Sequence, residues 1–295
     1  MLFRSIPSLS AKLLLLRKAK QADVVVVLRK TFTAPFIFLL RLFSKRMVFD
    51  FDDAVLTSSN GKLSSTRMKR FEKMMKACDA IWAGNEYLAT QARLFNTSVT
   101  VLPTSIAPET YDISSPKPDN SFDLVWIGSS STKKYLVDVI PILEQAAKTI
   151  PHLRLKIIAD FTLYSDKLNI YPVQWQSLTE AMDLASSHAG IAPMPDDPWT
   201  KGKCGLKVIQ YMAAGLPVIS SPSGVNKDIV THGTTGFLAE NYEQWIQALT
   251  RLSADATLRS DMGNKGKAFI QQRYSINHSF QIMKTCLETL VSGKP

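Results

Sequence analysis

Short apolar runs rich in β-branched residues recur along the chain and alternate with longer segments of helical periodicity. Val24–Leu28 is typical, because all of its residues are apolar and no polar residue interrupts it. Strands of this kind are buried on both faces, as in parallel sheets whose connecting helices cover both sides. The sequence therefore predicts an α/β fold with two Rossmann-like, doubly wound parallel sheets. The expected strands are Val24–Leu28, Met47–Phe51, Ala80–Ala83 and Val99–Leu102, then Phe122–Ile127, Leu153–Ala159, Ala189–Ala192 and Pro217–Ser220.

A segment rich in proline, serine and aspartate separates the two groups of strands at Pro103–Ser121, which is typical of a linker. After Gly236 the pattern becomes entirely helical. We therefore expect a first domain over residues 1–120, a second over 121–275 and a C-terminal helix over 276–295. Parallel sheets bind ligands at the carboxyl ends of their strands, so we expect the site in a cleft that the two domains face. The three helices expected at the C-terminal end are Tyr242–Leu252, Ala256–Gln272 and Ile276–Val291.

The excess positive charge lies in the N-terminal quarter of the chain. The first 80 residues hold 16 Lys/Arg and 6 Asp/Glu, and this excess equals the net charge of +10 for all 295 residues. The apolar stretches Leu13–Leu16 and Phe36–Phe43 lie among these basic residues. Two interpretations remain open, namely buried amphipathic helices with solvated basic faces and contact with an anionic membrane. Nucleic acid is not an expected partner, because the basic residues match no reader motif.

Cysteine usage and hydropathy indicate the compartment. Cys78, Cys204 and Cys286 are odd in number and lack metal-ligand spacing, as expected of reduced thiols in a cytosolic protein. No apolar run approaches the roughly 20 residues that span a bilayer, and Leu13–Leu16 is too short for the core of a signal peptide. We expect a cytoplasmic protein, with peripheral contact to the inner face of a membrane as the open alternative. Ser-His-Asp order, zinc spacing and a P-loop are all missing from the sequence.

Three strand-to-helix junctions of the second domain carry residues suited to a nucleoside diphosphate. After Phe122–Ile127, a small hydroxyl-rich loop leads into a helix, where Ser131 or Thr132 would be the N-cap and free N–H groups would favour an anion. The alternative is an ordinary N-cap with solvated lysines. The residues of this loop predicted to bind the donor are Gly128, Ser129, Ser131, Thr132, Lys133 and Lys134.

The second junction follows Ala189–Ala192, where Gly205 is expected to open a helix. Lys203, Lys207 and Gln210 are spaced by four and three residues, which places them on one helical face beside a diphosphate and a ribose. A solvated basic face is the alternative. The third junction is the glycine-containing turn after Pro217–Ser220. The residues of these two junctions predicted to bind the donor are Asp196, Asp197, Lys203, Cys204, Gly205, Leu206, Lys207, Gln210, Gly224, Val225 and Asn226.

Carboxylates follow a strand of the first domain. Asp50 and Asp52 alternate onto one face as Met47–Phe51 ends, and Asp53 comes next. They suit acceptor hydroxyls or a divalent metal ion, or they simply cap the following helix. Asn85 and Glu86 open a helix after the neighbouring strand. We assign Asp50, Asn85 and Glu86 to the acceptor side.

With these junctions in place, the chain resembles the retaining GT-B glycosyltransferases that include bacterial cell-wall, capsule and lipopolysaccharide sugar transferases. The resemblance implies sugar transfer from a nucleoside diphosphate donor with retention of configuration, without a metal ion, to a glycan or lipid-linked acceptor. It further implies that Asp52 and Asp53 match the catalytic pair of the first domain and that Lys203 stabilises the leaving diphosphate. The segments that carry it are CGLKVIQYMAAGLPVI (204–219), SPSGVN (221–226), HGTTGFL (232–238), FDFDDA (49–54) and AGNEYL (83–88).

The sequence departs from this family at three places. Of the family's two glutamates eight positions apart, the second, which holds the donor ribose, falls on Gln210, and the first falls near Gly202. The family's arginine and lysine after the first strand of the second domain fall on Ser129 and on Lys133 or Lys134. The first predicted strand already begins at Val24, which implies a shortened N-terminal domain. A catalytically impaired or partner-dependent nucleotide-sugar-binding protein is therefore the alternative function.

Overall fold

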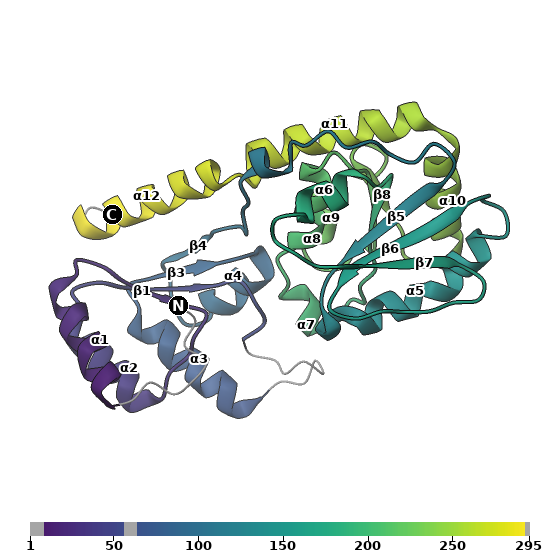
Figure 1. Cartoon of the computed structure of the whole chain (residues 1–295). Helices are drawn as coiled ribbons and strands as arrows, with labels where there is room; N and C mark the ends of the chain where they lie inside the picture. The colour runs from purple at the N-terminus through teal and green to yellow at the C-terminus, as the bar shows by residue number, and fades with distance from the viewer. Residues whose placement is uncertain (1–8, 56–63, 293–295) are drawn as a thin grey trace. The chain divides into compact units, whose positions relative to one another are not determined.

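The computed structural model describes residues 9–55 and 64–292, in which two parallel sheets each have helices on both faces (Figure 1). The predicted α/β class, with two parallel sheets and a helical C-terminal part, is confirmed. The chain forms two compact units. Unit 1 comprises Met1–Pro103, Lys201–Cys204 and Ser279–Pro295, and unit 2 comprises Thr104–Thr200 and Gly205–His278. Unit 1 therefore includes Lys201–Cys204, four residues that lie between two segments of unit 2 in the sequence.

The sheet of unit 1 has the order β1-β2-β3-β4. Its lower face in Figure 1 packs on four helices around Phe49, Phe51 and Phe71, whereas the last helix covers Val48 and Trp82 on the other face. The strands are β1 (Val25–Leu28), β2 (Met47–Phe51), β3 (Ala80–Ala83) and β4 (Val99–Val101). The helices are α1 (Leu9–Gln21), α2 (Ala34–Phe43), α3 (Ser65–Ala77), α4 (Glu86–Arg93) and α12 (Ile276–Ser292).

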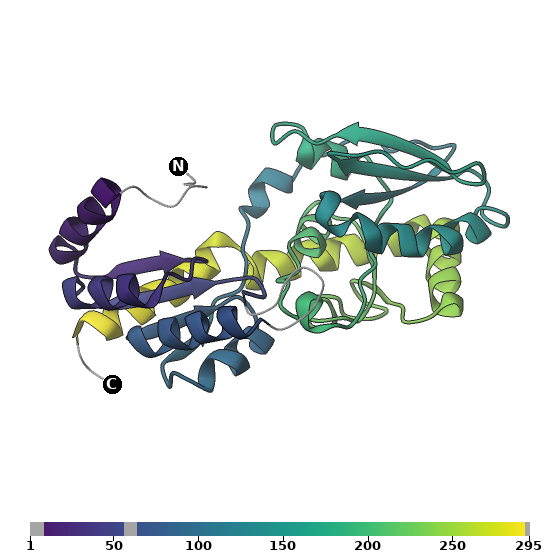
Figure 2. The same ribbon diagram turned by 90° about the horizontal axis from the view of Figure 1, so that it is seen from below.

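The sheet of unit 2 has the order β10-β9-β8-β5-β6-β7, with α5 and α10 on one face and α6, α8, α9 and α11 on the other. Its edge strand β7 is the uppermost strand in Figure 2. The strands are β5 (Phe122–Ile127), β6 (Leu153–Ala159), β7 (Asn169–Gln174), β8 (Ala189–Ala192), β9 (Val218–Ser220) and β10 (Gly236–Leu238). The helices are α5 (Lys133–Ala146), α6 (Glu180–Ala185), α7 (Pro198–Lys201), α8 (Leu206–Ala213), α9 (Asn226–Ile229), α10 (Tyr242–Ala254) and α11 (Ala256–Arg273), with 3-10 turns η1 (Pro108–Tyr111) and η2 (Ser130–Thr132).

Two strands of unit 2, β7 and β10, were not predicted. β7 is an edge strand whose residues are all partly or fully exposed, and it contains Pro172. It therefore lacks the buried, apolar character by which the other strands were found. β10 has only three residues. The three predicted C-terminal helices are present as α10, α11 and α12, with ends that differ by at most two residues.

Within the described residues, no helix combines the length and the apolarity that crossing a bilayer would require. The exposed apolar side chains of α1 and α2 belong to short helices that also have a buried side, formed by Leu16 and Ala19 in α1 and by Phe36 and Leu40 in α2.

Candidate functional site

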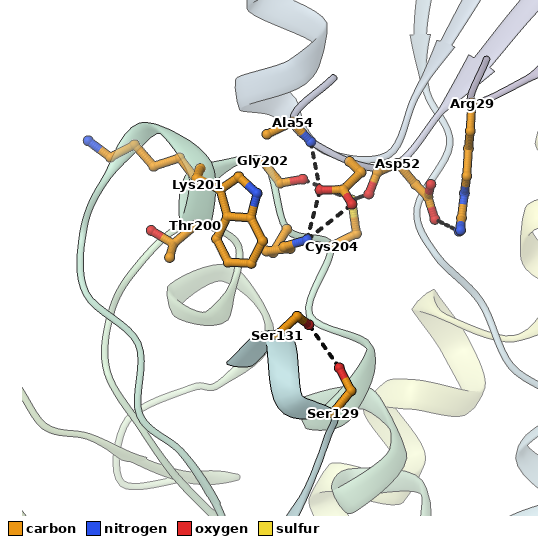
Figure 3. Close-up of polar contacts among 12 residues, drawn as sticks. Arg29, Asp52, Ala54, Ser129, Ser131, Thr200, Lys201, Gly202 and Cys204 are labelled. Carbon is orange, nitrogen blue, oxygen red and sulfur yellow. Dashed lines mark hydrogen bonds and ion pairs between the residues drawn. The ribbon is translucent and has the colours of Figure 1, made fainter. Parts of the chain in front are cut away.

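The loop after β5 is held by its own hydrogen bonds. Gly128 has no room for a side chain, because an added Cβ would overlap the indole of Trp126. The Ser130 hydroxyl and backbone N–H donate to Asp160 at 2.6 and 3.0 Å. The hydroxyls of Ser129 and Ser131 lie 2.8 Å apart (Figure 3). The loop is thus fixed by a carboxylate from the end of the neighbouring strand, which the sequence did not indicate.

The predicted N-cap position of α5 is confirmed at Thr132, but its side chain makes no cap bond. The Thr132 hydroxyl instead donates back to the carbonyl oxygen of Ser129 at 3.2 Å. This backward bond arises because residues 130–132 form a 3-10 turn before the helix starts. The lysines that follow lie over aromatic rings, Lys133 at 4.9 Å from the Phe161 centroid and Lys134 at 4.9 Å from that of Tyr135.

Helix α8 begins one residue after Gly205, which takes a left-handed conformation with φ of 71°. An added Cβ there would contact Val225 and Ile229, so the turn after β9 packs directly against the start of α8. In that turn Gly224 has φ of 54°, and the amide of the buried Asn226 donates to the Ser220 hydroxyl at 2.9 Å. The structure therefore brings the second and third predicted junctions together in unit 2.

The predicted common face of Lys203, Lys207 and Gln210 is wrong for Lys203. The left-handed Gly205 interrupts the helix, so Lys203 precedes it and belongs to unit 1. Only Lys207 and Gln210 lie on α8 itself, three residues apart, and the first helical residue, Leu206, is half-exposed. The spacing argument assumed that the helix already includes Lys203, whereas it begins only after Gly205.

Lys207 is a half-buried cation on the first turn of α8. Its ammonium lies 4.3 Å from the ring centroid of Trp126, and within the described residues no carboxylate pairs with it. Burial lowers the pKa of Lys207 to about 7, because no negative group compensates for lost hydration. An anion bound here would supply the missing charge.

Gln210 is buried, and its amide nitrogen donates to Glu180 Oε1 at 2.7 Å and to the Tyr111 hydroxyl at 3.0 Å. Neither partner was predicted from the sequence, since they lie 30 and 99 residues away in the chain.

The two predicted aspartates after β8 differ in their surroundings. Asp197 accepts 2.8 Å hydrogen bonds from the backbone N–H groups of Trp199 and Thr200, and so it caps the short helix α7. Asp196 is exposed. The carboxylate of Asp197 is therefore engaged in local structure.

In unit 1, the segment Lys201–Cys204 is held by Asn85, which was assigned to the acceptor side, and by Asp53, which was assigned to catalysis. The Asn85 side chain accepts from Leu88 N at 2.9 Å, which caps α4, and its amide donates at 3.0 Å to the carbonyls of Lys201 and Lys203. The Lys203 ammonium pairs with both carboxylate oxygens of Asp53 at 2.9 and 3.0 Å. Glu86 pairs with Arg93 on its own helix. Asn85 and Asp53 are thus occupied by this segment.

Asp50 and Asp52 lie at the carboxyl end of β2, beside Arg29 at the end of β1. Arg29 pairs with Asp52 and has φ of 56°, a conformation that is rare for a residue with a side chain (Figure 3). The second oxygen of Asp52 is buried without a hydrogen-bond partner among the described residues. Burial, together with the neighbouring charge of Asp52, raises the pKa of Asp50 to about 6.

The three carboxylates do not form a metal-ligand cluster within residues 9–55 and 64–292. They do not cap the next helix of the described structure either, because α3 begins at Ser65 and is capped by Ser64. Arg29 was missed in the sequence because nothing in a strand-end arginine indicates which distant carboxylate it will contact.

Comparison with known proteins assigns the chain to a family. The profile described as "Glycosyl transferases group 1" matches residues 109–269, which is more than half of the chain and nearly all of unit 2. The chain belongs to the group 1 glycosyl transferases. The predicted GT-B family and fold are therefore confirmed.

Solved structures show the same fold at low sequence identity. HepE of Anabaena, solved in complex with UDP, superposes with a TM-score of 0.73 at 14% identity over 95% of this chain and 82% of that chain. The sucrose-phosphate synthase of Thermosynechococcus elongatus gives 0.72 at 15% identity over 93% and 75%. These similarities show that the fold is shared over 93–95% of this chain, beyond the residues that the profile matches.

A curated relative is the GDP-Man:Man(3)GlcNAc(2)-PP-Dol alpha-1,2-mannosyltransferase of Dictyostelium discoideum, 28% identical over 102 residues. That alignment covers 34% of this chain and 19% of the relative, and a second curated glycosyltransferase is covered over 22% of its length. The chain thus spans about a fifth of these relatives.

Proposed function

We propose that this group 1 glycosyl transferase moves a sugar from a nucleoside diphosphate donor to a glycan or lipid-linked acceptor of the cell envelope, with retention of configuration. The observation that carries the proposal is Lys207, a half-buried cation without a carboxylate partner in the described structure, at the start of a helix that follows a parallel strand. Helix starts with free N–H groups bind phosphate, and a nearby lysine adds a charge-assisted hydrogen bond.

The roles of the residues follow from their positions. In unit 2, Lys207 and the N–H groups of Leu206 and Lys207 would hold the diphosphate, and Gln210 the ribose. The Gly128–Lys134 and Gly224–Asn226 loops would border them. In unit 1, the carboxylates of Asp50, Asp52 and Asp53 would accept hydrogen bonds from the acceptor hydroxyl. Lys203 would contribute to catalysis through its ion pair with Asp53. Because cationic side chains and helix N–H groups stabilise the leaving diphosphate, we propose that turnover needs no divalent metal ion.

Addition of UDP or GDP should stabilise unit 2. A ligand at 100 times its dissociation constant raises the free energy of unfolding by about 2.7 kcal/mol, which a thermal-shift titration resolves. The matching sugar nucleotides should release nucleoside diphosphate in the presence of chelator, and NMR of the product should show the anomeric configuration of the donor. Turnover that stops in chelator and resumes with magnesium would contradict metal independence, and an inverted product would contradict retention.

A binding protein without turnover is the second candidate. Its supporting observation is that Lys203 and Asp53, both assigned to catalysis, neutralise each other as an ion pair. In that case the nucleotides would stabilise the protein, but no nucleoside diphosphate would be released from any donor tested with membrane-extracted acceptors.

We further propose a cytoplasmic location, with unit 1 docked on the anionic inner face of a membrane. The side of α2 opposite its buried residues exposes Phe38 and Leu42, each at 68%, and an exposed apolar face of this kind is typical of an interaction surface. The neighbouring helix α1 exposes Leu14 between basic residues. Apolar side chains flanked by cations match the interface of a membrane containing anionic lipid. The basic residues of α1 are Lys12, Arg17, Lys18 and Lys20.

The protein should therefore sediment with vesicles containing phosphatidylglycerol at low salt and be released as the salt concentration rises, because each basic residue near the surface contributes about 1 kcal/mol within the Debye length. Phe38→Ser combined with Leu42→Ser should weaken this binding. Leu94→Ser, at an apolar residue of unit 1 that is 70% exposed, is the matched control and should not. Equal binding to neutral vesicles, or none at low salt, would leave the basic residues as a solvated surface.

A further inference from the structure

Three side chains from separate elements of unit 2 donate hydrogen bonds to one carboxylate, that of Glu180. Glu180, the first residue of α6, accepts hydrogen bonds on Oε1 from the Tyr111 hydroxyl at 2.6 Å and from the Gln210 amide at 2.7 Å. Its Oε2 accepts from the indole N–H of Trp175 at 2.6 Å. Both carboxylate oxygens therefore have fixed donors, although the residues come from η1, the end of β7, α6 and α8.

This arrangement determines which way the Gln210 amide faces. An ionised carboxylate only accepts hydrogen bonds, so the amide must present its nitrogen to Glu180 and its oxygen to the opposite side. The Gln210 side-chain oxygen accepts no hydrogen bond from the described residues. It is not fully buried either. It is thus an acceptor that solvent reaches, on the helix that carries Lys207 one turn earlier.

We propose that Glu180 is a positioning residue that fixes the Gln210 amide so that its oxygen accepts a hydrogen bond from a ribose hydroxyl of the bound nucleotide. The inference rests on the proposed function, because it concerns the same donor site. A neutral amide without this constraint could rotate and offer either its nitrogen or its oxygen. With Glu180 in place, glutamine presents an acceptor where an acidic residue would otherwise be needed, and Tyr111 and Trp175 in turn hold Glu180.

The experiment measures the preference for ribose hydroxyls rather than affinity alone. Dissociation constants of UDP and of 2′,3′-dideoxy-UDP are compared by calorimetry, with the GDP pair in parallel and inorganic pyrophosphate as a probe of the diphosphate contacts alone. The wild type should favour the ribonucleotide by about tenfold, since the net free energy of one hydrogen bond corresponds to about that factor.

Glu180→Gln should reduce this preference to below about threefold and leave pyrophosphate binding unchanged. The double variant E180Q/Q210E exchanges the carboxylate and the amide, so it keeps their mutual hydrogen bond and returns an acceptor to position 210. It should restore the preference, which a role of Glu180 in packing alone would not predict. Glu243→Gln, at an exposed glutamate in the first turn of α10, is the matched control and should behave as the wild type.

Three outcomes overturn the inference. A wild-type preference retained in Glu180→Gln would show that Glu180 does not position the acceptor. If Glu180→Gln does not fold, the double variant decides: a folded E180Q/Q210E protein without the preference would show that Glu180 does not position the acceptor. Wild type that binds UDP without distinguishing the dideoxy analogue would overturn the inference alone, whereas wild type that binds none of the diphosphates would overturn the proposed function with it.

Discussion

Replacing Lys207 by methionine should weaken binding of a nucleoside diphosphate by about 10- to 100-fold, because it removes a charge-assisted hydrogen bond worth about 1.5–3 kcal/mol. The same change should stabilise the unliganded protein. Lys207 is half-buried with its ammonium over Trp126, and no carboxylate lies beside it in the described structure. Its positive charge therefore destabilises the folded protein until an anion binds. Methionine keeps the packing of the side chain and removes the charge.

The sign of the pH dependence follows from the lowered pKa. Between about pH 7 and the ordinary lysine value of 10.5, the unfolded chain binds a proton at Lys207 that the folded chain does not. The stability contributed by this residue therefore rises with pH across that window, and the penalty is fully present below pH 7. Lys207→Met should exceed the wild type in unfolding free energy by at least about 1.4 kcal/mol at pH 6, corresponding to one pKa unit, and the gain should vanish toward pH 10.

Denaturant titrations at pH 6, 7 and 9 and UDP calorimetry at pH 7, 8 and 9 measure both effects. Affinity in the wild type should fall as the pH rises above 7, while the variant should show no such dependence. Lys265→Met, at an exposed lysine of α11, is the control and should change neither quantity. A variant that loses stability while keeping its affinity would show that Lys207 is a structural cation and not part of the donor site.

Two glycines one turn apart on α11 should respond oppositely to alanine. A Cβ at Gly263 would overlap the carbonyl oxygen of Gly215, so helix α11 must move away from the end of α8. We expect Gly263→Ala to lower the free energy of unfolding by about 3 kcal/mol, the upper range for overpacking in a core. At Gly266 a Cβ would lie 3.4 Å from Met212 Cβ, and alanine favours the helix by about 0.5–1 kcal/mol.

Chemical denaturation of the two variants measures this difference. Gly266→Ala should equal or exceed the wild type in stability, which makes it the internal control for helix propensity. If both variants were equally unstable, α11 would be intolerant of any added volume, and the close approach of Gly263 to Gly215 would not be the cause.

The strands with continuous apolar sequence were predictable, and most of them are buried on both faces, as at Ala80–Ala83. The expected burial is wrong for β1, an edge strand that exposes Val26 and Leu28. The edge strand β7 was not, because its exposed positions and Pro172 resemble a loop. Glycine had two effects on the site predictions. Gly205 was correctly placed at a helix start, but its left-handed conformation also separated Lys203 from the face on which Lys207 and Gln210 lie.

Partners far apart in sequence could not be predicted at all. Arg29 pairs with Asp52 across 23 residues, and Gln210 contacts Tyr111 across 99, contacts that depend on strand order and helix packing. Asp160, which holds the loop after β5, ends the next strand of the sheet, and its role depends on the register of β5 and β6. Local patterns thus identified the loops, whereas the hydrogen bonds that fix them required the three-dimensional arrangement.

The four residues that unit 1 takes from the middle of the unit 2 sequence limit how such proteins can recombine. A Cβ at Gly202 would overlap Ala54, and one at Gly84 would overlap Cys204, so both glycines are set by residues distant in the gene. In a chimaera joined at residue 103, residues 201–204 would come from one parent. Their contacts Ala54, Gly84 and Asn85 would come from the other. Exchange of unit 2 between relatives therefore requires these positions to be inherited together, and a single crossover separates them.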